Sequence, residues 1–218
     1  MPILKFPPHT DADTDGLLAF GGDLEPASLL LAYRSGIFPW PLGQFGTLAW
    51  FSPPTRAVLR FSKLHIPQSL KRRMNRQPFR LSIGENFGAV IQSCAQRHQA
   101  QDKLGTWITP ELSEAYIRLH HLGFALSAEA WDGSLLVGGV YGVYFDGKFA
   151  AESMFYYSPD ASKLALIHLI DFLKKEGLTW IDIQVMTPHM KKWGAEVISR
   201  DRFLKLLIET HAPVSRPS

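Results

Sequence analysis

The sequence predicts an α+β protein, in which a small irregular N-terminal domain precedes a domain with a mostly antiparallel mixed sheet flanked by helices. Two hairpins carry this prediction. Asp132-Gly133 and Asp146-Gly147 each join two expected strands as a tight turn, which is the pattern of an antiparallel meander. A long apolar helical pattern and a further strand pattern follow the hairpins. We place the domain boundary at residue 60, which gives domains at 1–60 and 61–218.

The N-terminal domain is rich in glycine, proline and aromatic residues. A short helix at residues 26–34 is expected, because Pro26 suits a first helical position and Gly36 suits a left-handed cap. Trp40 and Trp50 are suited to two roles, either packing in a core or stacking against nucleic-acid bases.

The second domain has a more regular pattern. Thr109-Pro110 is typical of a helix start, and Gly123 of its end. Ser199 is expected to cap the last helix. The expected strands are 57–61, 79–83, 125–131, 135–145, 149–155 and 180–186, and the expected helices are 66–76, 87–99, 109–123, 161–175 and 199–210.

Composition limits the classes of function. The chain has 218 residues, of which 46% are hydrophobic and 20% charged, as in folded globular proteins. Cys94 is the single cysteine, so an intramolecular disulfide and a Cys-rich zinc site are excluded. No His-Glu-x-x-His, Gly-x-Ser-x-Gly or Walker-type motif occurs, so we predict no metal and no nucleotide cofactor. No apolar run is long enough to cross a membrane, and we expect a cytoplasmic protein.

Basic residues gather in one segment, although the net charge is only +3. Lys71, Arg72, Arg73 and Arg76 fall in the expected helix at 66–76. Such a cluster either neutralises phosphates of a nucleic acid or forms a solvated helix face.

Three polar residues are candidates for chemistry. In the expected strand at 180–186, alternation places Asp182 and Gln184 on one face. Glu152 adds a carboxylate from the expected strand at 149–155. These residues form either an acidic, partly apolar pocket or the solvated side of a half-buried sheet.

Six segments, in this order along the chain, resemble those of the leucyl/phenylalanyl-tRNA protein transferase family. They are Gly16-Leu-Leu-Ala-Phe-Gly-Gly-Asp-Leu24, Tyr33-Arg-Ser-Gly-Ile-Phe-Pro-Trp40, Trp50-Phe-Ser-Pro-Pro-Thr-Arg-Ala-Val-Leu59, Gly105-Thr-Trp-Ile-Thr109, Glu152-Ser-Met-Phe155 and Ile181-Asp-Ile-Gln184. The resemblance implies an N-acetyltransferase-like second domain. It also implies transfer of leucine or phenylalanine, with methionine as a further candidate, from aminoacyl-tRNA to the N-terminal amine of proteins that begin with Arg or Lys. The product would be marked for N-end-rule degradation.

The same resemblance implies roles for single residues. Gln184 matches the family's proposed catalytic glutamine, with Asp182 to orient it or to attract the cationic acceptor, and Glu152 to add negative charge. The implied aminoacyl pocket is Val140, Phe149, Ala151, Leu169 and Leu173. Tyr33 and Trp107 would hold the terminal adenosine, and Lys71, Arg72, Arg73 and Arg76 the acceptor-stem backbone.

This chain departs from the family pattern at two positions beside the pocket. Ala151 stands where glycine is usual, and Tyr156 where serine is usual. The coenzyme A pyrophosphate motif Gln/Arg-x-x-Gly-x-Gly/Ala is absent before the helix expected at 161–175, which argues against coenzyme A. Two other functions remain open: a related acyltransferase with a different donor or acceptor, and a non-catalytic RNA-binding module.

Overall fold

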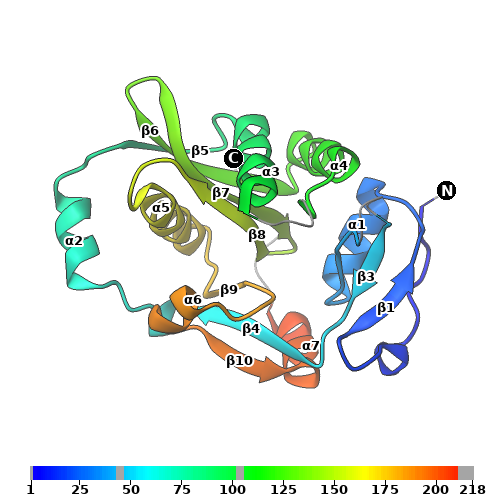
Figure 1. Ribbon diagram of the computed structural model, residues 1–218. Helices are drawn as coiled ribbons and strands as arrows, with labels where there is room; N and C mark the ends of the chain where they lie inside the picture. The colour runs from blue at the N-terminus through cyan, green and yellow to red at the C-terminus, as the bar shows by residue number, and fades with distance from the viewer. Residues whose placement is uncertain (1, 43–46, 102–105, 211–218) are drawn as a thin grey trace.

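The computed structural model describes residues 2–42, 47–101 and 106–210 (Figure 1). Gly105, which begins one of the six family segments, lies outside the described residues. The strands are β1 (Leu17–Phe20), β2 (Phe38–Pro39), β3 (Ala49–Phe51), β4 (Thr55–Arg60), β5 (Arg80–Ile83), β6 (Ala125–Asp132), β7 (Leu135–Phe145), β8 (Lys148–Tyr156), β9 (Trp180–Asp182) and β10 (Glu196–Ser199). The helices are α1 (Pro26–Arg34), α2 (Gln68–Asn75), α3 (Phe87–Gln101), α4 (Pro110–His121), α5 (Ala161–Lys175), α6 (Pro188–Lys192) and α7 (Arg200–Glu209), with short 3-10 helices at His9–Asp11 and Phe61–Lys63.

The strands form two sheets, which confirms the α+β class and the mostly antiparallel mixed sheet. The N-terminal sheet has the order β1-β3-β2, and the larger sheet has the order β10-β4-β9-β8-β7-β6-β5. Every pairing in the larger sheet is antiparallel except that of β8 with β9. The expected hairpins at Asp132-Gly133 and Asp146-Gly147 are both present, as β6–β7 and β7–β8.

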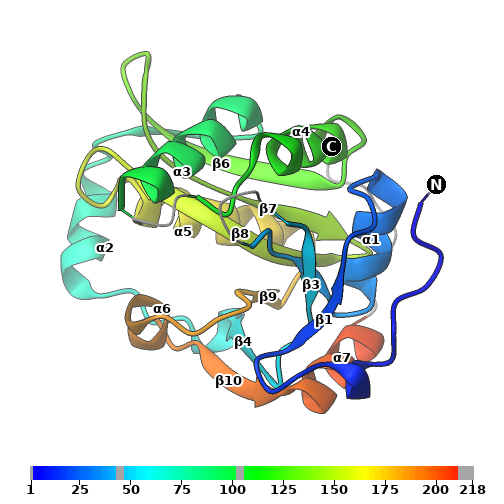
Figure 2. The same cartoon turned by 45° about the vertical axis from the view of Figure 1, so that its right-hand side comes forward.

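Helices cover both faces of the larger sheet (Figure 2). Neighbouring residues of β7 show the division, because Val140 packs in the core cluster that contains α5 whereas Tyr141 packs in the cluster that contains α3 and α4. The cluster with Tyr141 also includes Leu29 and Trp50 of the N-terminal region. Residues before 55 therefore share a core with the larger sheet.

Strand β4 belongs to the larger sheet by its pairing with β9 and β10. The larger sheet therefore begins at Thr55, before the boundary placed at residue 60. Strand β10 and helix α6 lie in a segment where the sequence predicted no regular element. No helix in the described residues is long and apolar enough to cross a membrane.

The strand expected at 180–186 is wrong in length, because β9 ends at Asp182. Gln184 takes a left-handed backbone conformation with φ of 51°, and Val185 N donates to Ile183 O at 2.6 Å across it. This i to i+2 hydrogen bond across a residue of positive φ is that of a classic γ-turn, which is rare and strained. Ala57 of β4 holds the turn, since Ile183 N donates to Ala57 O and Ala57 N to Gln184 O, both at 3.0 Å.

Strands β8 and β9 pair at a single register position, Ala150 with Asp182. Beyond it β8 continues for six residues to Tyr156, whereas the chain after Asp182 turns away. The two segments therefore separate, and the sheet opens at this point.

Replacing Gly138 by alanine tests the packing of α5 on the sheet. A Cβ there would lie 2.5 Å from Ala161 Cβ and 2.7 Å from Ser162 N, at the start of α5. Since this backbone cannot move without shifting α5, we expect Gly138→Ala to lower the free energy of unfolding by about 1–3 kcal/mol in urea titrations. Gly88→Ala in α3 is the control, because its Cβ meets only Asn86 Oδ1, at 4.0 Å. A Gly138→Ala protein as stable as the control would contradict this packing.

Candidate functional site

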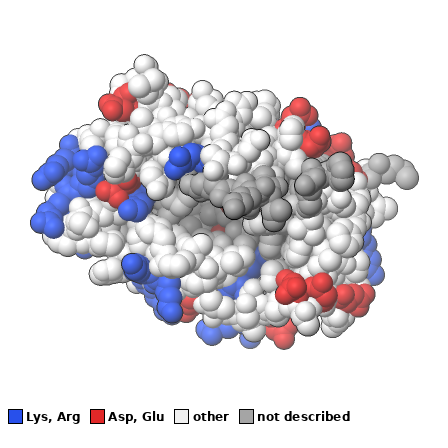
Figure 3. All heavy atoms as spheres, in the orientation of Figure 1, with Lys and Arg blue, Asp and Glu red and all other residues white. Residues whose placement is uncertain are grey.

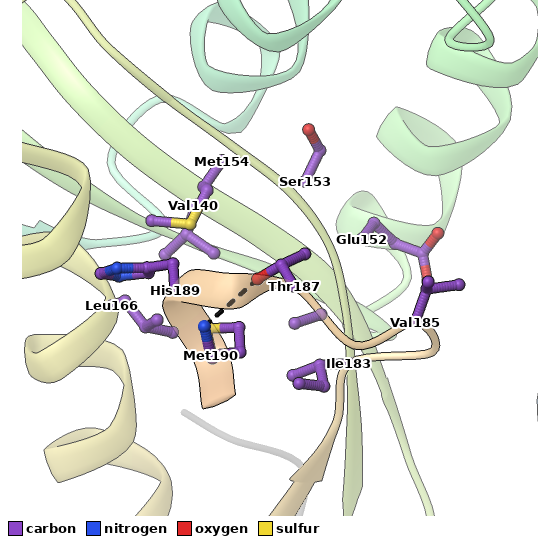
Figure 4. Close-up of a pocket in the computed structure, with 11 residues that line it drawn as sticks. Val140, Glu152, Ser153, Met154, Leu166, Ile183, Val185, Thr187, His189 and Met190 are labelled. Carbon is purple, nitrogen blue, oxygen red and sulfur yellow. Dashed lines mark hydrogen bonds between the residues drawn. The ribbon is translucent and has the colours of Figure 1, made fainter. Parts of the chain in front are cut away.

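A cavity of about 220 Å³ occupies the opening between β8 and the segment after β9. We call it the aminoacyl pocket, after the role that the resemblance implies. Figure 4 shows Glu152 and Val185 at one end, and Met154, Leu166 and His189 at the other. The lining residues are Val140, Ala151, Glu152, Ser153, Met154, Leu166, Ile183, Val185, Thr187, His189 and Met190. The pocket is thus mainly apolar with a carboxyl group at one end.

The backbone of Gln184 is fixed by Asp182. Gln184 N donates to Asp182 Oδ1 at 2.9 Å, and both residues are buried. The two residues are brought together as the sequence predicted, but by this bond within a turn and not by a shared face of a strand. Asp182 therefore acts on the backbone conformation that places the Gln184 side chain.

Arg56 holds Asp182 in turn. Its Nε lies 2.9 Å from Asp182 Oδ1 and its Nη2 lies 2.7 Å from Oδ2, which is a bidentate ion pair. The side chains are 2% and 4% exposed, respectively. The guanidinium carbon also lies 4.5 Å from the Phe38 ring centroid and 4.7 Å from that of Phe203. The pair therefore joins β2, β4 and α7 to the turn that carries Gln184.

Sequence reasoning missed Arg56, although it lies in one of the six family segments. A signal was present, because an arginine directly precedes the apolar run Ala57-Val58-Leu59 in an expected strand. A charge beside such a run requires a buried partner or an exposed position, and the sequence does not distinguish the two.

Glu152 accepts hydrogen bonds from Gln184 and Tyr116. Gln184 Nε2 donates to its Oε1 at 2.8 Å, and Tyr116 Oη donates to its Oε2 at 3.1 Å. Tyr116 Oη lies 2.6 Å from Tyr33 Oη, so the chain of hydrogen bonds continues into α1. These contacts connect Glu152, Gln184 and the N-terminal region in one network.

Burial raises the pKa of Glu152 to about 7, and the negative charge of Asp182 adds to the increase. The hydroxyls of Tyr33 and Tyr116 and the Arg56 guanidinium act in the opposite direction. Glu152 can consequently gain or lose a proton near neutral pH, which is the property of a general acid or base.

The predicted aminoacyl-pocket residues fall into two groups. Val140 and Ala151 line the pocket, whereas Phe149, Leu169 and Leu173 do not. The latter three are at most 1% exposed and pack in the core beneath it. The pocket also has apolar lining residues that sequence reasoning did not assign, namely Met154, Leu166, Ile183, Val185 and Met190. They escaped notice because apolar residues in a core and in a pocket have the same sequence pattern.

The two residues predicted to hold adenosine are in different environments. Tyr33 is 2% exposed and is engaged with Tyr116. Trp107 is partly exposed and stacks on Trp40, with ring centroids 4.8 Å apart. His98 links Trp107 to the pocket, because its ring packs edge-on against Trp107 and its Nε2 lies 2.9 Å from Ser153 Oγ. Trp107 is therefore the better placed of the two to contact a ligand.

The four predicted tRNA-binding residues lie on or directly after α2, away from the catalytic candidates. Lys71, Arg72 and Arg76 are exposed. Arg73 is half-buried over the Phe79 ring, and its Nε has no hydrogen-bond partner in the described part of the chain. Figure 3 shows Lys and Arg side chains gathered at the left edge of the molecule, where Figure 1 places α2.

Within the described residues, no three His, Cys, Asp or Glu side chains are grouped so that they could hold a metal ion. Cys94 is buried, and burial raises the pKa of its thiol to about 12. It is therefore a thiol, not a thiolate, at neutral pH.

Comparison with known proteins identifies close sequence relatives. A family model described as "Leucyl/phenylalanyl-tRNA protein transferase" matches residues 58–208, and one for the N-terminal domain of that transferase matches residues 22–54. The protein of this name from Anaeromyxobacter dehalogenans (strain 2CP-C) is 46% identical over 95% of this chain and 91% of its own length. That from Syntrophobacter fumaroxidans is 48% identical over 96% of this chain and 91% of its own length.

Solved structures show more distant similarity. L-PGS from Bacillus licheniformis aligns with a TM-score of 0.44 and 14% identity, over 75% of this chain and 52% of that one. A GCN5-related N-acetyltransferase-like protein from Streptococcus suis aligns with a TM-score of 0.39 and 14% identity, over 80% of this chain and 66% of that one.

The Arg56–Asp182 pair is tested by Arg56→Met. Because Asp182 would remain buried without its partner, we expect the free energy of unfolding to fall by about 3–5 kcal/mol. The control is Arg60→Met on the same strand, whose pair with Glu196 is 28% and 24% exposed and should contribute at most about 1 kcal/mol. If urea titrations showed equal losses of the free energy of unfolding in the two variants, the buried pair would contribute no more to stability than the partly exposed pair.

The pKa of Glu152 predicts a pH dependence of stability. Since folding raises this pKa from 4.5 to about 7, the folded state retains a proton that the unfolded chain loses between these values. Stability should therefore fall as pH rises through this window, by about 3 kcal/mol more in the parent protein than in Glu152→Gln. Urea titrations across the window measure the difference, with exposed Glu114→Gln as control. Parallel curves for the parent protein and Glu152→Gln would refute the raised pKa.

Proposed function

The chain belongs to the leucyl/phenylalanyl-tRNA protein transferase family, and on that premise we propose its donors, its acceptors and the roles of its residues. As a member, it is an aminoacyl transferase with an aminoacyl-tRNA donor and a protein acceptor. We propose that it transfers leucine, phenylalanine or methionine to the N-terminal amine of cytoplasmic proteins beginning with Arg or Lys. The added bulky residue would mark these proteins for N-end-rule degradation.

The observation that carries this proposal is the hydrogen bond from Gln184 Nε2 to Glu152 Oε1 at the polar end of an apolar pocket. An apolar side chain can occupy the pocket while its ester carbonyl lies near these polar groups. The reacting groups are then oriented by binding, which is a large source of rate acceleration.

The pocket lining supports an apolar donor residue. Met154, Leu166 and Met190 are flexible or unbranched at Cβ, and methionine in particular adapts its shape to a ligand. A missing methylene changes binding by only about 1–3 kcal/mol, so discrimination among leucine, phenylalanine and methionine should be incomplete. Ala151 presents a methyl group to this pocket where the family usually has glycine, which reduces the space for the larger donors.

Glu152 is better suited than Asp182 to bind the cationic first residue of the acceptor. Asp182 is neutralised by Arg56 and is buried, whereas Glu152 lines the pocket and accepts hydrogen bonds from two neutral groups, Tyr116 Oη and Gln184 Nε2. An arginine or lysine side chain near Glu152 would also lower the pKa of that carboxyl group.

The chemistry needs no covalent enzyme intermediate. The acceptor amine attacks the ester carbonyl, the bond to the ribose oxygen breaks, and an amide forms. Because Gln184 Nε2 donates to Glu152, its carbonyl oxygen is the part of the amide that can accept from the attacking amine. The amine's proton passes to Glu152, to water or to a ribose hydroxyl, and the ribose oxygen leaves protonated.

A transfer assay tests this proposal. Purified protein is incubated with labelled Leu-tRNA or Phe-tRNA and with an acceptor that begins with Arg, Lys or Ala. We expect label in the Arg and Lys acceptors only. Label in the Ala acceptor would contradict the acceptor rule, and no transfer with intact tRNA binding would favour a non-catalytic RNA-binding module.

Variants should separate catalysis from binding. Gln184→Ala should bind aminoacyl-tRNA normally and lose about 100-fold in kcat, because it removes a group that orients the reacting amine. Arg72→Gln should retain kcat but bind more weakly, and its affinity should depend less steeply on salt. Filter binding and single-turnover transfer measure the two effects. A Gln184→Ala protein with unchanged kcat would exclude the proposed role of the amide.

A further inference from the structure

The wall of the aminoacyl pocket carries a hydroxyl group that the chemistry described above does not use, that of Ser153. Ser153 follows Glu152 on β8. His98 of α3 holds this side chain, because His98 Nε2 lies 2.9 Å from Ser153 Oγ. A polar group that is fixed at the wall of a mainly apolar pocket is suited to orient a ligand.

A β-bulge places Ser153 on the same side of the sheet as Glu152. The register of β7 with β8 shifts at Glu152, which is the extra residue of β8. Consecutive strand residues ordinarily point to opposite faces. Here Glu152 contacts Tyr116 of α4 and Ser153 contacts His98 of α3, and these two helices cover the same face. The bulge therefore directs two adjacent polar side chains to one side, as bulges near active sites commonly do.

The pocket consequently has an apolar side and a polar side. Val140 and Met154 pack with the core cluster of α5, whereas Glu152 and Ser153 face α3 and α4. Figure 4 shows the Ser153 side chain pointing away from Leu166. The side chain of a donor amino acid fits the apolar side, so its ester group lies toward the polar side.

Ser153 and His98 lie between Glu152 and Trp107, the candidate contact for the terminal adenosine. Glu152 is the neighbour of Ser153 in the chain, and the His98 ring packs edge-on against Trp107 with centroids 6.1 Å apart. In an aminoacyl-adenosine the ribose lies between the ester carbonyl and the base. A carbonyl beside Glu152 and a base on Trp107 therefore bring the ribose to Ser153.

The Ser153 hydroxyl has hydrogen-bonding capacity for a ligand. A hydroxyl has one donor and two acceptor lone pairs, and His98 takes one of these in either tautomer. The buried thiol of Cys94, which also lies beside Ser153, is only a weak hydrogen-bonding group. A ribose hydroxyl both donates and accepts, so it complements either arrangement of the serine.

We propose that Ser153, held by His98, binds the free ribose hydroxyl next to the ester and so selects a donor that ends in a ribonucleotide. This hydroxyl distinguishes RNA from DNA. Ser153 is the contact residue, and His98 is a positioning residue that acts through it. The proposal rests on the proposed function, because it takes the donor to be an aminoacyl-tRNA.

The test combines a change in the protein with a change in the ligand, and it measures binding by calorimetry so that the result does not depend on transfer. One ligand is 3′-leucylamido-3′-deoxyadenosine, whose amide replaces the ester, and the other is the same compound without its 2′-hydroxyl. The parent protein should bind the first about 10-fold more tightly, because one hydrogen bond is lost in the second. Ser153→Ala should weaken binding of the first about 10-fold and leave binding of the second unchanged.

Two further variants separate positioning from packing. His98→Phe keeps a ring against Trp107 but has no ring nitrogen. It should reduce the preference for the hydroxyl ligand, leave binding of the 2′-deoxy ligand unchanged and have no further effect when combined with Ser153→Ala. The matched control is Ser158→Ala, a serine just after β8 that does not line the pocket, and it should keep the full preference.

Three results would overturn the proposal: equal affinity of the parent protein for the two ligands, equal weakening of both ligands by Ser153→Ala, or loss of the preference in Ser158→Ala. If the parent protein binds neither compound, the same two groups are placed at the end of full-length tRNA, where an absent preference again overturns it. A transfer assay with Leu-tRNA runs in parallel. No transfer together with the expected binding pattern would contradict the proposed function and leave the ribose contact in place.

Discussion

The buried ion pair between Arg56 and Asp182 is the interaction on which the site depends. Two charges removed from water cost several kcal/mol each, and their attraction offsets this cost only when the geometry is good and the remaining polar atoms are satisfied. Here the pair is bidentate, the guanidinium lies between the rings of Phe38 and Phe203, and Asp182 also accepts from Gln184 N. A hydrophobic pair could stabilise the fold equally well. It could not fix the turn at Gln184, because it would have no oxygen to accept the hydrogen bond from Gln184 N. The charged pair is thus explained by positioning rather than by stability.

The pocket exists because strands β8 and β9 stop pairing after one register position. After the single β8–β9 contact, the γ-turn at Gln184 directs the chain away from β8, and the aminoacyl pocket fills the opening. A non-glycine residue with positive φ costs about 1–3 kcal/mol, and it persists only where surrounding contacts determine it. Ala57 and Asp182 supply those contacts. Gln184 is consequently oriented before a substrate binds.

Local signals in the sequence predicted much of the fold. Both Asp-Gly turns form hairpins, the helix expected at 161–175 is present with those limits, and Thr109 and Ser199 cap their helices. The errors came from contacts between distant residues. The strand at 180–186 was predicted too long because its apolar alternation continues past Asp182, whereas the pairing with Ala57 and the bond from Gln184 N to Asp182 end it there. Arg56 was missed for the same reason, since its partner lies far along the chain.

Glu152, Asp182 and Gln184 were selected from sequence together with the family resemblance, and the structure brings them into one network. Sequence could not separate Val140, which lines the pocket, from Leu169, which is buried beneath it. Both positions require an apolar residue. The separation of β8 from β9 decides which of these two side chains, Val140 or Leu169, lines the pocket.

The central claim is that Arg56 acts on transfer through Gln184, and a double-mutant cycle on the single-turnover rate tests it most directly. Arg56→Lys, Gln184→Ala and the double variant are compared with the parent protein at saturating aminoacyl-tRNA, after each is shown to be folded. If Arg56 only positions Gln184, Arg56→Lys should slow the parent protein but should not slow Gln184→Ala further. Losses that multiply in the double variant would show that the two residues act independently, and would contradict the account.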